Sequence, residues 1–73
     1  MDINEVKKMV LELASIEPTA ANIAHYENCD YLTQNTGRDG EEYIWYMDEH
    51  VSVAVRVSDG VELTADEIEK NFC

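Results

Sequence analysis

The sequence is short of several residue types, and each shortage excludes a class of protein. It has two cysteines, one proline, three glycines and five basic residues among its 73. Cys29 and Cys73 can form at most one disulfide, far fewer than the bridges by which tiny secreted domains compensate for small cores. Residues 1–15 are interrupted by charge every two or three positions, so they hold no apolar run for a signal peptide. We therefore expect a reduced, cytoplasmic protein.

Positive charge is also scarce. Sixteen acidic residues against five basic ones give a net charge of -11, which opposes binding to a phosphate backbone or to an anionic membrane. The one basic pair, Lys7 and Lys8, is flanked by Glu5 and Glu12. The chain is nowhere apolar for even a third of a bilayer span. We expect neither a direct nucleic-acid partner nor a membrane attachment.

The length predicts one small domain over residues 1–73. Such a chain hides about three-fifths of its surface on folding, which is enough for a thin core. A thin core leaves little room for a catalytic pocket, and no catalytic or cofactor motif stands out in the sequence. We expect a protein that is not an enzyme and binds no cofactor.

Two segments of the N-terminal half have helical patterns. Asp2 and Glu5 form a capping-box pattern, and an apolar stripe follows at intervals of three and four residues: Ile3, Val6, Met9, Val10, Leu13 and Ala14. This pattern predicts an amphipathic helix that ends near Pro18, because proline donates no backbone hydrogen bond. Thr19 can cap a possible short second helix before a strand near residues 31–34.

The C-terminal half predicts a hairpin and a last helix. Residues 37–40 and 59–60 are turns, since their glycines supply positive φ angles. Between them lie two extended segments, residues 41–47 and 51–58, and the second alternates valines with small or polar residues. Thr64 and Glu67 then offer a second capping box. The predicted fold is α+β, with a three-stranded antiparallel meander between an N-terminal amphipathic helix and a short C-terminal helix.

The loop between the last two strands decides which side chains share a face with the valines. A three-residue loop, 48–50, places Met47 opposite Val51 and Trp45 opposite Val53, with Tyr43 opposite Val55, so the tryptophan enters the core. We favour this register because Asp48-Glu49 lacks the turn chemistry of two-residue hairpins. It places Arg56 opposite Glu42.

A loop of even length gives the other register. It places Tyr46 opposite Val51, puts Tyr43 and Trp45 over small side chains, and sets Arg56 opposite Glu41. Either register leaves two large apolar side chains on the second face of the sheet. We expect a helix over residues 19–27 to cover that face, and an exposed contact patch is the alternative.

The reactive side chains form no recognisable site. His25 and Cys29 are spaced to meet on one helix face, but two ligands do not make a zinc site, and His50 and Cys73 lie far along the chain. The neighbours of Cys29, Glu27 and Asp30, disfavour a reactive thiolate. Adjacent carboxylates are plentiful in charged, turn-rich stretches where water solvates them. We expect no catalytic residue and no metal.

The acidic residues are the remaining clue to function. Between residues 39 and 69 the chain has ten acids and one base, Arg56. Such a surface steers toward basic grooves. We expect a non-enzymatic module that binds a basic protein through the hairpin and the C-terminal helix, with an aromatic anchor. The candidate surface consists of Glu41, Glu42, Asp48, Glu49, Asp59, Glu62, Asp66, Glu67, Glu69, Tyr43 and Trp45.

In size, charge and helix-hairpin-helix order the chain resembles small acidic inhibitors encoded by phages and mobile elements, such as anti-CRISPR and antirestriction proteins. This likeness implies a nucleic-acid mimic that inhibits a basic DNA- or RNA-processing protein. The alternative is a structural or assembly protein that forms a homodimer through an exposed sheet face, because edge strands and leftover apolar surface favour self-association.

Overall fold

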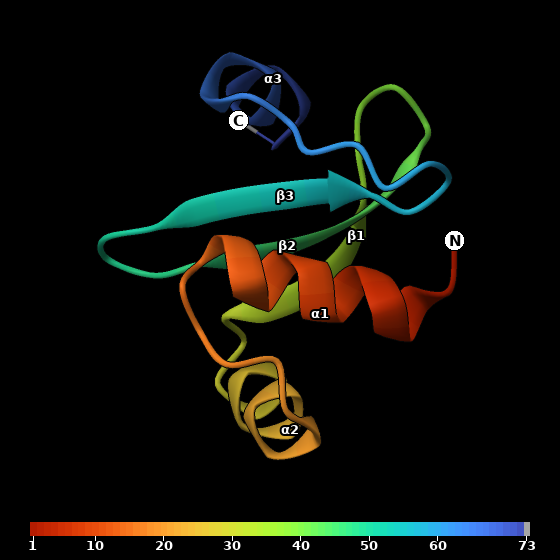
Figure 1. Cartoon of the computed structure of the whole chain (residues 1–73). Coiled ribbons are helices and arrows are strands. Elements are labelled where there is room, and N and C mark those ends of the chain that lie inside the picture. Colours follow the sequence, from red (N-terminus) through yellow and green to blue (C-terminus); the bar gives the residue numbers. More distant parts are fainter. Residues whose placement is uncertain (73) are drawn as a thin grey trace.

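A computed structural model describes residues 1–72, arranged as three helices and a three-stranded antiparallel sheet (Figure 1). The elements are α1 (Ile3–Leu13), α2 (Ala20–Asn28), β1 (Leu32–Thr36), β2 (Glu42–Met47), β3 (Ser52–Arg56) and α3 (Ala65–Phe72). The strand order is β1-β2-β3. The predicted α+β class, the meander and all three helices are confirmed. Cys73 lies outside the described residues. None of the described helices is long and apolar enough to cross a bilayer.

Side-chain caps start the helices. The carboxylate of Asp2 accepts the Asn4 N–H at 3.0 Å, and the Thr19 hydroxyl accepts the Asn22 N–H at 3.1 Å. Before α3, the Glu67 N–H donates to the Thr64 hydroxyl and the Thr64 N–H donates to the Glu67 carboxylate. This reciprocal pair is the capping box that the sequence predicts there.

Left-handed residues end α1 and α2. Ser15 has φ 63° and Asp30 has φ 62°. After α1 the Ile16 N–H turns back to the Leu11 carbonyl at 2.9 Å, which satisfies a carbonyl of the last helical turn. The first helix therefore ends at Leu13, five residues before the proline that we expected to stop it.

The favoured hairpin register is wrong. The loop between β2 and β3 has four residues, 48–51, and the opposed pairs are Ile44 with Val55, Trp45 with Ala54, Tyr46 with Val53 and Met47 with Ser52. Each side chain therefore lies on the face that the even-length loop predicts. The pairing itself differs by two residues, because Tyr46 lies opposite Val53 and not opposite Val51. Arg56 consequently lies opposite Tyr43, and opposite neither Glu41 nor Glu42.

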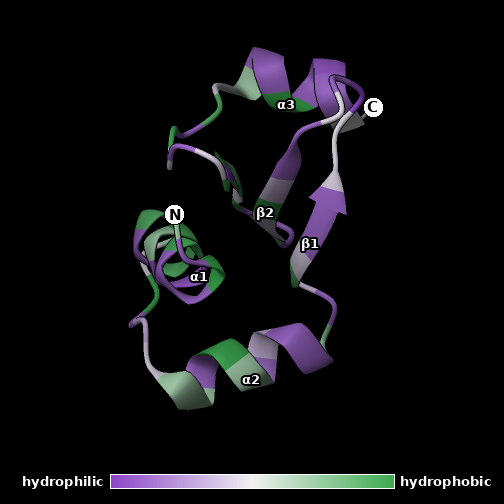
Figure 2. Ribbon diagram, turned by 90° about the vertical axis from the view of Figure 1, so that its right-hand side faces the viewer, coloured by the Kyte–Doolittle hydropathy of each residue, from purple (hydrophilic) through white to green (hydrophobic). Residues whose placement is uncertain are grey.

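The first face of the sheet carries the main core. Three side chains of α1 and the C-cap Ala14 pack against it. The buried set is Val6, Val10, Leu11, Ala14, Leu32, Ile44, Tyr46, Val53 and Val55. Figure 2 shows α1 beside the sheet. Ile23 and Tyr26 of α2 pack at the margin of this cluster.

The second face is covered by α3, where we expected the helix of residues 19–27. Tyr43 and Ala54 pack there with Leu63 and with Ile68 of α3. Figure 1 shows α3 on the side of the sheet opposite to α1. The expectation of a covering helix holds, but the identity of that helix is corrected.

Candidate partner-binding surface

The fold separates the predicted acidic residues into two groups. Glu41 and Glu42 lie where β2 begins, and the loop of residues 57–64 follows β3 at the same end of the hairpin. Asp48 and Glu49 lie in the β2–β3 loop at the opposite end. The remaining acids, Asp66, Glu67 and Glu69, are exposed on α3. The larger acidic surface therefore runs from the start of β2 to α3, and the β2–β3 loop is separate from it.

The two aromatic candidates differ in exposure. Tyr43 is 1% exposed and belongs to the core beneath α3. Trp45 is half-buried and packs with Met47 against the same cluster. Neither ring projects from the sheet as a free anchor, so an apolar contact has to be sought elsewhere on the surface.

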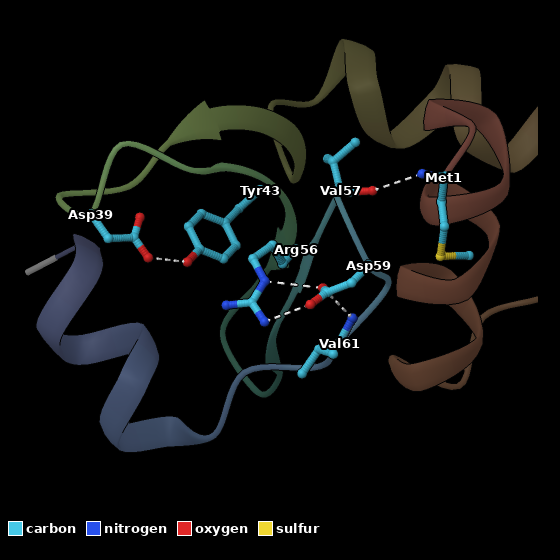
Figure 3. Close-up of polar contacts among 7 residues, drawn as sticks. All are labelled: Met1, Asp39, Tyr43, Arg56, Val57, Asp59 and Val61. Carbon is cyan, nitrogen blue, oxygen red and sulfur yellow. Dashed lines mark hydrogen bonds and ion pairs between the residues drawn. The ribbon is translucent and has the colours of Figure 1, made fainter.

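Polar contacts hold the turn between β1 and β2 and the loop after β3 (Figure 3). The Tyr43 hydroxyl donates to the Asp39 carboxylate, and the Arg56 guanidinium binds Asp59 through two hydrogen bonds of 3.0 and 2.7 Å. The bond from Tyr43 holds the pKa of Asp39 below its ordinary value, and Arg56 does the same to the pKa of Asp59. These two carboxylates stay charged, but they are engaged within the fold.

Asp48 is also engaged. Its carboxylate accepts the His50 N–H, the Val51 N–H and the Tyr46 hydroxyl, each at 2.7 Å. These bonds lower the pKa of Asp48, the Tyr46 hydroxyl most of all, while burial raises the pKa of Tyr46. Asp48 therefore shapes the loop, whereas its neighbour Glu49 is exposed at the tip.

An apolar groove lies beside the acidic surface. It has a volume of about 460 Å³ and is lined by Met9, Glu12, Leu13, Gly60 and Glu62. Gly60 has φ 72°, and a side chain there would collide with the Met1 sulfur. Leu13 is 41% exposed. Within the described part of the chain, neither Glu12 nor Glu62 forms an ion pair or a side-chain hydrogen bond. The groove combines flexible apolar side chains with two unpaired carboxylates.

The groove was not predicted from the sequence. The pattern that could have indicated it is the apolar stripe of α1, which has more residues than the helix buries. Ile3 and Leu13 belong to the predicted stripe, yet both are exposed, while Leu11 outside the stripe is fully buried. Surplus apolar residues on a helix therefore marked surface as well as core.

The predicted histidine and cysteine pair lies apart from this surface. Cys29 is exposed at the end of α2, and the ring of His25 lies edge-on to Tyr26 with centroids 4.9 Å apart. Residues 1–72 contain no group of three or more histidine, cysteine or acidic side chains placed to hold a metal ion.

Comparison of the chain with protein-family models, curated proteins and solved structures finds no match. The geometry of the surface is therefore the basis for any functional proposal.

Proposed function

We propose that the protein is a non-enzymatic binding module for a basic protein surface. Its support is electrostatic. The chain has a net charge of -11, and the cations Lys7 and Arg56 are already paired with Glu27 and Asp59. Exposed acids on α3 and in the loop before it thus present negative charge that the fold does not neutralise. Such a surface attracts a cationic partner and increases the rate of association.

The groove beside α1 is the observation that carries the proposal. Charge alone gives steering with little specificity, whereas an apolar contact removed from water gives affinity. Met9 and Leu13 supply flexible apolar surface, and Glu12 and Glu62 flank it with charge. The complementary ligand is an apolar side chain between lysines or arginines. The face that a homodimer would use carries α3, so the arrangement favours a different protein as partner.

The dimensions support the more specific proposal of nucleic-acid mimicry. The molecule measures 31 × 27 × 18 Å. Duplex DNA of the same length has about 18 phosphates, given one charge per roughly 1.7 Å. A charge of -11 on a body of this size approaches that density. We therefore propose as target a basic DNA- or RNA-processing protein, of the kind that phages or mobile elements inhibit.

The test is capture of partners from the native host on immobilised protein, at low and at physiological salt, read by mass spectrometry. We expect to recover a basic protein that is retained at low salt and released by duplex DNA. Its binding should be weaker at physiological salt. Recovery of nothing at either salt contradicts the proposal. A captured protein that duplex DNA does not displace would contradict nucleic-acid mimicry and leave the proposed binding module in place.

Two variants of equal charge locate the surface. One neutralises Glu62, Asp66 and Glu69, and its matched control neutralises Glu5, Glu17 and Asp30, which are also exposed. We expect only the first variant to lose the partner. Leu13→Ser tests the groove and should weaken capture at both salt concentrations. Equal losses in the two charge variants would mean unspecific attraction and contradict the proposed surface.

A further inference from the structure

The two edges of the sheet are treated differently by the fold. The outer edge of β3 is paired with the segment that follows it, because the Arg56 N–H donates to the Val61 carbonyl at 3.0 Å and the Leu63 N–H donates to the Ala54 carbonyl at 2.9 Å. The outer edge of β1 has no neighbouring strand within the described residues. In Figure 2, β1 forms the outer side of the sheet and is mostly hydrophilic.

The register identifies the backbone groups on this open edge. The Met47 N–H donates to the Tyr31 carbonyl, and the Gly37 N–H donates to the Glu41 carbonyl. In an antiparallel pair the bonded positions alternate, so the odd-numbered residues of β1 face β2. The backbone groups of Leu32, Gln34 and Thr36 therefore point away from the sheet, but Leu32 is buried, so the accessible groups are those of Gln34 and Thr36.

The open edge lacks the features that usually prevent pairing. The strand Leu32–Thr36 contains no charge and no proline, and its register with β2 runs without a bulge. Gln34, Asn35 and Thr36 are exposed. An uncharged edge on so acidic a molecule presents backbone donors and acceptors without repelling a strand that approaches.

A carboxylate beside this edge indicates the charge of the ligand. Glu42 lies across from Thr36 and accepts hydrogen bonds from the Thr36 hydroxyl at 3.0 Å and the Gln34 side-chain amide at 3.2 Å. Glu42 is exposed. On an added strand, a cationic side chain beside Thr36 would lie next to this carboxylate. A second copy of the chain would instead bring another charge of -11 to the same place.

We infer that the β1 edge binds an extended segment rich in lysine or arginine as a fourth strand. The outward backbone groups of the exposed residues Gln34 and Thr36 supply the hydrogen bonds, and Glu42 selects a cation. This inference rests on the proposed function for the chemistry of the partner. It adds that the partner contributes a strand, a mode in which main-chain bonds give affinity and alternate side chains give specificity.

The test uses NMR of the isotope-labelled full chain with a short synthetic peptide of alternating lysine and threonine. We expect slowed exchange at the amides of Gln34 and Thr36, with the inward amides of Thr33 and Asn35 unchanged. The same peptide with methylated backbone nitrogens should give no protection. Glu42→Gln should weaken binding roughly two- to fivefold, the range expected for a cross-strand charge pair.

Two proline variants provide the matched control. Gln34→Pro removes an outward donor from β1, and Ser52→Pro removes one from β3, so neither breaks a bond between the native strands. Only Gln34→Pro should abolish the protection. The methylated peptide keeps the test valid if either variant fails to fold, because it leaves the protein unchanged.

The contrary outcomes separate this inference from the proposed function. Peptide-induced shifts confined to α3 and the loop before it would overturn strand addition and leave the acidic binding module in place. Absence of any binding at low salt would contradict both. Concentration-dependent protection of β1 without peptide would identify a second copy as the ligand and overturn the inference.

Discussion

At the scale of single residues, the acids differ in what they do. Asp39, Asp48 and Asp59 accept hydrogen bonds that hold the fold together, and each has a lowered pKa for that reason. Exposed acids on α3 and in the groove, such as Glu62 and Glu69, have no such partners within the described chain. Composition gives one charge for all of them, whereas the structure distinguishes the three aspartates that shape loops from the exposed glutamates that a ligand can reach.

Tyr46→Phe should raise the pKa of Asp48 toward its ordinary value of 3.8, because the Tyr46 hydroxyl is the main cause of the lowering. An NMR titration of the carboxyl carbons measures this, and Asp59 is the internal control, since Arg56 lowers its pKa. Stability that depends on a lowered carboxyl pKa is complete above the ordinary pKa and is lost as the pH falls through the lowered one. The loss of stability in the variant should therefore be largest near neutral pH and shrink below about pH 4. An unchanged pKa of Asp48 in this variant would contradict the role given to the Tyr46 hydroxyl.

At the scale of elements, the helices and strands were predictable because each has a local signal. The caps at Thr19 and Thr64, the turns at glycines and the valine alternation are each defined by a few neighbouring residues. The hairpin register was not predictable in this way. Asp48 replaces turn glycines by binding the His50 and Val51 N–H groups, which sets a four-residue loop. One loop residue more or fewer reverses every face assignment in the hairpin.

The candidate surface was predictable in charge and not in shape. Exposure of the α3 acids follows from the amphipathic pattern around Ile68. The burial of Tyr43 depends on α3 crossing the second face, and the groove depends on α1 lying beside the loop of residues 57–64. Both are tertiary contacts that no local pattern specifies. The prediction of Trp45 as an anchor also depended on which helix covers the second face.

Two leucines of α1 test which face the helix buries. Leu11→Ala should lower the free energy of unfolding by about 2–5 kcal/mol, because Leu11 is fully buried in the main core. Leu13→Ala should change it by no more than about 0.5 kcal/mol, since Leu13 is exposed in the groove. Urea denaturation measures both, and Leu11→Val is a milder substitute if the alanine variant does not fold. Equal costs at the two positions would contradict the orientation of α1.

At the scale of the whole molecule, the charge that attracts a partner also opposes folding. The greatest dimension is 31 Å, about one Debye length at 0.01 M salt, whereas the Debye length is about 8 Å at physiological ionic strength. At low salt the carboxylates therefore repel one another across the entire molecule. Exposed ion pairs such as Lys7 with Glu27 offset little of this repulsion.

Sodium chloride should therefore affect folding and binding in opposite directions. Between 0.01 M and physiological ionic strength we expect Tm to rise, because screening relieves self-repulsion, while capture of the basic partner weakens. Thermal unfolding followed by circular dichroism measures the first effect, in chloride because sulfate stabilises folded proteins irrespective of their charge. The variant that neutralises Glu62, Asp66 and Glu69 should show a smaller rise in Tm, since it removes three mutually repelling carboxylates. A Tm that falls with added chloride would mean that ion pairs outweigh repulsion, and the acidic surface would then be engaged within the fold and unavailable to a partner.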